Sequence, residues 1–141
     1  MDFTGLYKKV KALKIENLMD RAVMLNDTSI IDANTAQLSK GLMKDGNNID
    51  EYHSDSYAKY KKQIGSKAPL GIPDLHLDGG FYEGFYLKVD SEGYQIGSTD
   101  NKESDLQNKY SSKIFGLTDE SKSDLKPQIQ ENLIELIKNK L

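Results

Sequence analysis

An aspartate, a histidine and a second aspartate alternate along the short stretch DLHLD, at Asp74, His76 and Asp78. Every second side chain of an extended strand points to the same side, so this spacing would bring one imidazole and two carboxylates together. Such groups bind divalent metals, and the stretch is the best candidate metal site in the sequence. The competing interpretation is a polar strand face opposite Leu75 and Leu77, because neighbours on one strand diverge too widely to surround one ion. We favour the polar face and expect neither a metal nor a cofactor.

Other residue patterns that support catalysis are missing from the sequence. The chain has no cysteine and two histidines, His53 and His76, which excludes thiol nucleophiles, thiolate zinc sites and disulfides. Metal-dependent nucleases with a Pro-Asp motif need an acid and a lysine close together on one strand face, whereas Glu83 and Lys88 are five residues apart. The glycines of GGFYEG open a strand, whereas those of a phosphate-binding loop open a helix. We therefore expect a protein that is not an enzyme.

The composition is that of a folded protein. The chain has 141 residues, of which 37% are hydrophobic and 29% charged, and its net charge is −3. This mixture can bury one core, and we expect a single domain over 1–141. The lysine-rich stretches YKKVKALK and YAKYKKQIGSK are interpreted as solvated helix faces. Because the chain is acidic overall, we expect no specific nucleic-acid binding. It has no apolar run near the roughly 20 residues that a membrane span needs, so we expect no membrane segment.

The first half of the chain predicts helices separated by turns. Apolar residues recur at steps of three and four along 3–25, which predicts one amphipathic helix there. Shorter helices are expected over 29–40 and after a cap at Ser54 or Asp55. The segment GSKAPLGIP, residues 65–73, holds two prolines and two glycines and is expected to be a loop.

A second amphipathic helix is predicted at the C-terminal end of the chain. Its apolar stripe consists of Leu125, Ile129, Leu133, Leu136 and Ile137. Proline fits best in the first turn of a helix, so Pro127 predicts a start near Ser123 or Asp124. Thr118 is a candidate cap for an earlier turn.

Two β-hairpins are predicted, near 38–52 and over 81–98. The first rests on Asp45-Gly46, because glycine tolerates the positive φ of a tight turn. In the second, side chains on the two faces of a strand alternate from Phe81 onward, and a turn at DSEG, residues 90–93, leads into the antiparallel return strand. The side chains expected to face the core are Phe81, Phe85, Leu87 and Val89. The whole pattern predicts an α+β fold in which a small antiparallel sheet is packed by N-terminal and C-terminal amphipathic helices.

Five short sequences occur in a characteristic order before the last helix. They are QLSKGLMKDGNNIDEY, SYAKYKK, PDLHLDGGFYEGFYLKV, YQIGSTDNK and KYSSKIFGLT. In this order, over roughly 37–120, the chain resembles small virion morphogenesis proteins of tailed phages, the tail-completion or head–tail joining group. The sequence departs from that group at Asp78-Gly79, where the group has Thr-Gly, and at Tyr110-Ser111, where Tyr-Gly is expected.

The resemblance implies a non-enzymatic virion component. Such a subunit would form a homo-oligomeric ring at the head–tail junction or tail terminus and contact portal, neck or tail-tube proteins, after assembly in the bacterial host cytoplasm. It also implies that Gly79 opens the hairpin, that Phe81 and Phe85 anchor the core, and that Phe115 and Leu117 plug the core before the last helix.

An interface with other proteins is expected at the second hairpin and the loop. Tyr82 and Tyr86 would share the strand face opposite the core, where tyrosine favours protein contact, although a covering helix would make them ordinary packing residues. Pro69, Leu70 and Ile72 belong to the loop expected to reach a neighbour. Two other functions remain open: a monomeric adaptor or inhibitor that presents the same hairpin, and a small metal-dependent hydrolase that uses DLHLD.

Overall fold

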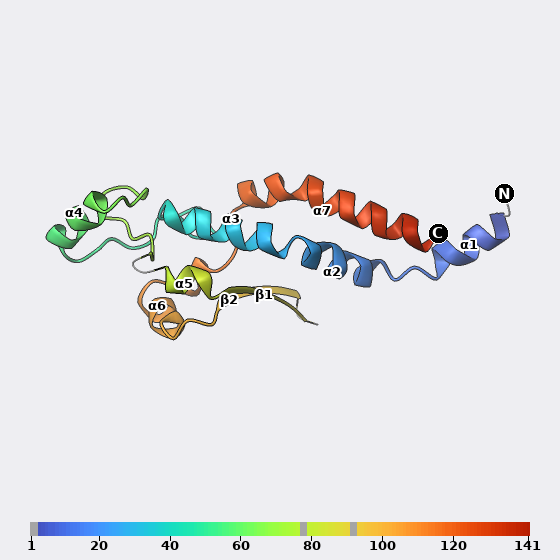
Figure 1. Ribbon diagram of the computed structural model, residues 1–141, viewed down its shortest axis with the longest axis horizontal. Coiled ribbons are helices and arrows are strands. Elements are labelled where there is room, and N and C mark those ends of the chain that lie inside the picture. The colour runs from blue at the N-terminus through green and yellow to red at the C-terminus, as the bar shows by residue number, and fades with distance from the viewer. Residues whose placement is uncertain (1–2, 77–78, 91–92) are drawn as a thin grey trace.

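The computed structural model describes residues 3–76, 79–90 and 93–141, and it confirms a small α+β fold. The helices are α1 (Phe3–Lys11), α2 (Ile15–Leu25), α3 (Asp27–Ser39), α4 (Asp55–Gln63), α5 (Gly80–Glu83), α6 (Glu103–Lys109), the 3-10 turn η1 (Ser112–Ile114) and α7 (Asp119–Lys140). Strands β1 (Phe85–Asp90) and β2 (Gly93–Ser98) form one antiparallel pair. The molecule is elongated, with α7 running back along α2 and α3 and α1 projecting at one end (Figure 1).

The predicted helix over 3–25 is wrong as a single element, because the chain breaks into α1 and α2 at residues 12–14. Helix α2 buries Leu18, Ala22 and Val23, whereas no residue of α1 is buried, so the two segments pack differently on either side of the break.

The hydrophobic core lies where α3 meets the following turn, the 65–73 loop, α5 and β1. Its buried members are Leu38, Met43, Ile49, Ala68, Ile72, Phe81, Phe85 and Ile114. The loop prediction is confirmed, since no helix or strand forms there, but the loop contributes two core side chains. Gly41, at φ +80°, is needed because a side chain there would collide with Ile72.

The hairpin predicted near 38–52 is wrong. Helix α3 continues to Ser39, which makes Leu38 a buried helical residue, and only an isolated bridge between Leu42 and Asn48 follows. A tight turn does form at the expected place, with Gly46 at φ +82°. The helix takes up the first two residues of the predicted hairpin because Leu38 completes its buried face.

The second hairpin is confirmed from Phe85 to Ser98, and Phe85, Leu87 and Val89 lie on its less exposed face. It does not begin at Phe81, because Gly79, at φ +85°, turns the chain into the short helix α5. The turn residues 91 and 92 lie outside the described residues.

Helix α7 begins four residues earlier than the start predicted at Ser123, so that prediction is wrong. The Thr118 hydroxyl accepts a hydrogen bond from the Ser121 N–H at 3.2 Å, which caps the helix. Pro127 therefore lies inside the helix, where it removes one backbone donor. In the described part of the chain, no helix is long and apolar enough to cross a membrane.

Candidate functional site

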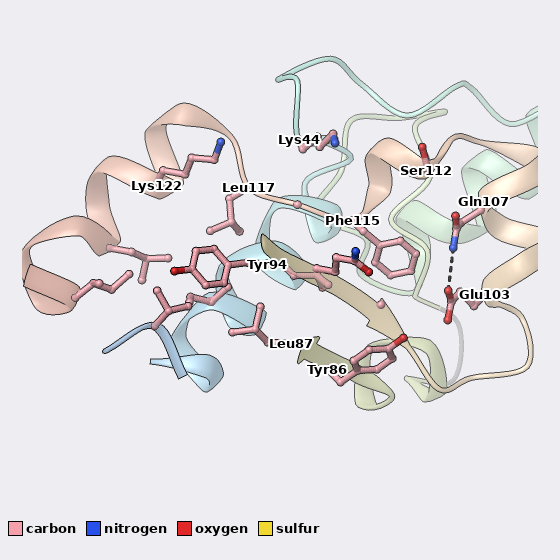
Figure 2. Close-up of a pocket in the computed structure, with 18 residues that line it drawn as sticks. Lys44, Tyr86, Leu87, Tyr94, Glu103, Gln107, Ser112, Phe115, Leu117 and Lys122 are labelled. Atoms are coloured by element: carbon pink, nitrogen blue, oxygen red, sulfur yellow. Dashed lines mark hydrogen bonds between the residues drawn. The ribbon is translucent and has the colours of Figure 1, made fainter. Parts of the chain in front are cut away.

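An apolar groove with a volume of about 740 Å³ lies between the β-hairpin and α7. Figure 2 shows Leu87 and Tyr94 of the hairpin facing Leu117, which lies just before α7. Val23 of α2 and Ile129 of α7 also line it. Aliphatic and aromatic side chains therefore dominate its walls, which suits an apolar partner.

Two buried amides hold one wall of this groove in place. The Asn34 side chain donates to the Ile114 carbonyl at 3.0 Å and accepts from the Gly116 N–H at 2.9 Å. The Gln37 side chain, one turn later on α3, donates to the Gly116 carbonyl and accepts from the Thr118 N–H, both at 2.9 Å. Both amides thus bond the backbone of 114–118 as a neighbouring strand would. We call these two side chains the amide clamp.

Sequence reasoning missed the amide clamp. The available signal was the position of Asn34 and Gln37 on the same helical face as Ile30 and Leu38, since polar residues in an apolar stripe indicate buried partners. Their partners are about 80 residues away in sequence, and no local pattern identifies them.

Three polar side chains of the groove are engaged within the protein. Glu103 accepts hydrogen bonds from the Gln107 side chain at 2.9 Å and from the Ser98 N–H at 3.2 Å (Figure 2). The Tyr94 hydroxyl donates to Asp20 at 3.1 Å. Burial, followed by this bond and the charge of Asp20, raises the pKa of Tyr94. The groove therefore offers contact area rather than a nucleophile paired with a base.

A second pocket, of about 430 Å³, surrounds a buried ion pair. The Lys61 ammonium lies 2.8 Å from the Asp74 carboxylate, and both side chains are nearly inaccessible to solvent. Lys61 also donates to the carbonyl of His76. The interpretation of Lys61 as part of a solvated helix face is wrong, because α4 directs it to this carboxylate.

The predicted strand through DLHLD does not form over the part that the structure describes. Asp74 is paired with Lys61, and Leu75 has φ 57°, which is incompatible with an extended strand. His76 is exposed, with its ring against that of Tyr82 at 5.0 Å, and Asp78 lies outside the described residues. Within the described ranges, no three histidine, cysteine or acidic side chains are grouped to hold a metal.

The two tyrosines of the predicted interface do not share a face. Tyr82 belongs to α5, lies half-buried beside the core, and donates its hydroxyl to the Asp74 carbonyl. Burial, with the Asp74 charge second, raises its pKa. Tyr86 is on β1, 41% exposed, and its ring lies so close to Gly97 that a side chain at Gly97 would collide with it.

The loop residues of the predicted interface also divide. Pro69 and Leu70 are exposed, and Leu70 has 61% of its surface accessible. Ile72 is 7% exposed and packs in the core, so its side chain is not free to meet a partner. Loop position alone did not reveal this, because the positive φ of Gly41 leaves the space that Ile72 fills.

Helix α1 carries three exposed apolar side chains, among them Phe3, the most exposed of the large apolar residues described. Phe3 is 73% exposed, Tyr7 63% and Val10 49%. These residues lie on one side of the helix, because they are spaced by four and three positions. Sequence periodicity predicted an amphipathic helix here, with Phe3 and Val10 in its stripe, but not that these side chains are exposed.

Comparisons with known proteins give no relative: no protein family, curated protein or solved structure matches this chain.

Proposed function

We propose that the protein is a structural component of a tailed-phage virion, a ring-forming subunit at the head–tail junction or tail terminus. Its partners would be further copies of itself and portal, neck or tail-tube proteins. The order of short sequences over 37–120 supports the virion assignment. The apolar surface of α1 supports assembly as the mode of action.

The observation that carries this proposal is the uncovered stripe of α1. An isolated helix shorter than about 12 residues is marginal in water, and helices in proteins gain most of their stability from packing an apolar face. Helix α1 has nine residues, none of them buried. Its apolar face is therefore suited to be covered by another chain.

The long shape is also compatible with assembly. Helix α1 lies at one end of the molecule and the hairpin nearer the middle (Figure 1). A contact between two such different surfaces is heterologous, and repeated heterologous contacts produce a ring when the rotation closes.

Light scattering during gel filtration tests the proposal. The full chain should form a species of several copies that negative-stain imaging resolves as a ring, and the chain lacking residues 1–14 should be a monomer. Ile64→Ser is the matched control, because Ile64 is an exposed apolar residue outside α1, at 51%. A full chain that stays monomeric at millimolar concentration would contradict self-assembly.

A further inference from the structure

We propose that α1 of one copy docks into the apolar groove between the β-hairpin and α7 of the next copy. This inference rests on the proposed function and names the contact that would join neighbouring subunits. It goes further in assigning one surface as the inserted element and another as its receptor.

The chemistry of the two surfaces matches. Helix α1 presents Phe3, Tyr7 and Val10 on one face, with the Lys11 ammonium over the ring of Tyr7 at 5.9 Å and other lysines around the helix. The groove presents Leu87, Tyr94, Leu117 and other apolar side chains, as Figure 2 shows. Its volume of about 740 Å³ is enough for several large side chains.

The groove is also partly open at two tyrosines that do not belong to the core cluster. Tyr94 is 48% exposed and Tyr86 is 41% exposed, and both line the groove. An apolar helix face placed against them would remove this surface from water. Burial of apolar surface contributes about 25 cal/mol for each Å².

Charge favours another copy as the occupant. The segment 3–14 carries four lysines and no acidic residue, whereas the whole chain has a net charge of −3. The remainder of each copy is therefore acidic as a whole, although the first turns of α7 hold Lys122 and Lys126 beside Asp119, Glu120 and Asp124. The charged side chains of the groove lining are Lys44, Lys122 and Glu103, so the attraction comes from the body of the neighbour and not from the groove itself. The overall attraction steers α1 toward the body of a neighbour and disfavours contact between two α1 helices.

Docking of α1 into the groove of its own copy is less favourable than docking into a neighbour. Its α1 lies beyond the C-terminal end of α7, away from the hairpin (Figure 1). The Lys9 ammonium donates to the Leu141 carbonyl at 2.9 Å, which links α1 to that end of the molecule. A neighbouring copy can approach the groove without breaking this contact.

Disulfide capture between differently substituted copies tests the docking directly, because the native chain has no cysteine. Copies with Tyr7→Cys are mixed with copies carrying Tyr94→Cys and oxidised mildly. We expect a covalent heterodimer as the main product. The matched control replaces the second partner by Tyr60→Cys, at a tyrosine of similar exposure, 47%, on α4. Equal yields in the two mixtures would overturn the docking site.

A groove variant separates this inference from the proposed function. Tyr94→Lys places a cation where α1 would dock and should weaken self-association at least tenfold, with an unchanged circular dichroism spectrum. If deletion of residues 1–14 abolishes assembly but Tyr94→Lys leaves it intact, the virion-subunit proposal stands and the groove is not the receptor. If neither change affects assembly, α1 is not the contact between copies and the docking proposal fails, whereas self-assembly of the full chain stands.

Two other occupants are outcomes of the same experiments. A single chain with both Tyr7→Cys and Tyr94→Cys that closes an internal disulfide at high dilution, in place of intermolecular products, would show that α1 folds back on its own groove. Cationic amphipathic helices also bind anionic bilayers. Sedimentation with phosphatidylserine vesicles that requires residues 1–14, without capture between copies, would assign α1 to a lipid surface. Either result would overturn docking between copies.

Discussion

The two ends of this molecule use apolar residues in opposite ways. At one end, α3, the 65–73 loop, α5 and β1 enclose a cluster that includes Leu38, Ile114 and Phe81, all less than 4% exposed. Helix α1, at the other end, contains no buried residue, and neither does α7, which runs from beside α3 toward that end (Figure 1), although both carry apolar stripes. Stability therefore resides mainly at the first end, and the second has surface left for association.

Polar side chains show the same contrast. The Lys61–Asp74 ion pair and the amide clamp are buried and fully partnered at the core end. On α7, Asp124 and Asn139 are exposed. Equivalent substitutions at the two ends should consequently lower the free energy of unfolding by very different amounts.

The largest expected effect is from breaking the buried ion pair. Asp74→Ala leaves the Lys61 ammonium buried without its counter-charge, and removal of one partner of such a pair costs about 3–5 kcal/mol. Urea denaturation should show this loss in the free energy of unfolding. The matched control, Asp124→Ala on α7, should change it by less than about 0.5 kcal/mol. Equal losses would remove the contrast between the two ends.

A smaller loss is expected when the amide clamp is opened. Asn34→Ala leaves the Ile114 carbonyl and the Gly116 N–H without partners, at a cost of about 2 kcal/mol. Asn139→Ala, at an exposed asparagine near the end of α7, is the control. The measurement is the urea midpoint, and a midpoint for Asn34→Ala equal to that of the wild type would show that the clamp does not hold the 114–118 segment.

The pH dependence sharpens the comparison further. Burial raises the pKa of Tyr82 above its usual 10.0, so the folded protein holds this proton more tightly than the unfolded chain. The resulting stabilisation is complete below about pH 10 and falls as the pH rises above it, because the unfolded chain then loses the proton first.

Tyr82→Phe tests this effect. It should cost about 1 kcal/mol at pH 8, where the hydrogen bond to the Asp74 carbonyl is lost, and the difference from the wild type should shrink above pH 10. Denaturation curves at pH 8 and 10.5 provide the measurement. Tyr7→Phe on α1 is the control and should match the wild type at pH 8. A constant difference at both pH values would contradict the sign of the effect.

The smallest effect is expected on α1. Phe3→Ser removes an aromatic side chain that is 73% exposed, and should change the free energy of unfolding of the monomer by less than about 0.5 kcal/mol. Phe81→Ala, at the core end, should cost about 3–5 kcal/mol and is the contrasting variant. A large loss for Phe3→Ser, measured in the dilute chain, would mean that α1 is covered within its own copy.

Local chemistry explains what the sequence could predict. Strand alternation placed Phe85, Leu87 and Val89 correctly because side-chain period two is set by the backbone itself. The role of Ser54 as a cap followed from a hydroxyl placed before a helical stripe, whereas Thr118, expected to cap an earlier turn, caps α7 itself. Each of these features depends on residues within a few positions of one another.

Features that depend on distant partners were not predictable in this way. Lys61 looked like a surface lysine because its partner, Asp74, is brought close only by the fold. Tyr82 looked like a strand residue because the turn at Gly79 shifts the strand start to Phe85. The same limit applies to the candidate site, whose groove joins the hairpin to a helix near the other end of the chain.

The amide clamp also has a consequence for the order of events during synthesis. Asn34 and Gln37 are made early, but the backbone groups that they bond lie about 80 residues later. Closing so long a loop is costly in entropy and slow compared with forming a helix. The parts of α2 and α3 that pack against residues 114–140 therefore stay uncovered on the ribosome until that segment has emerged, which exposes the nascent chain to premature association.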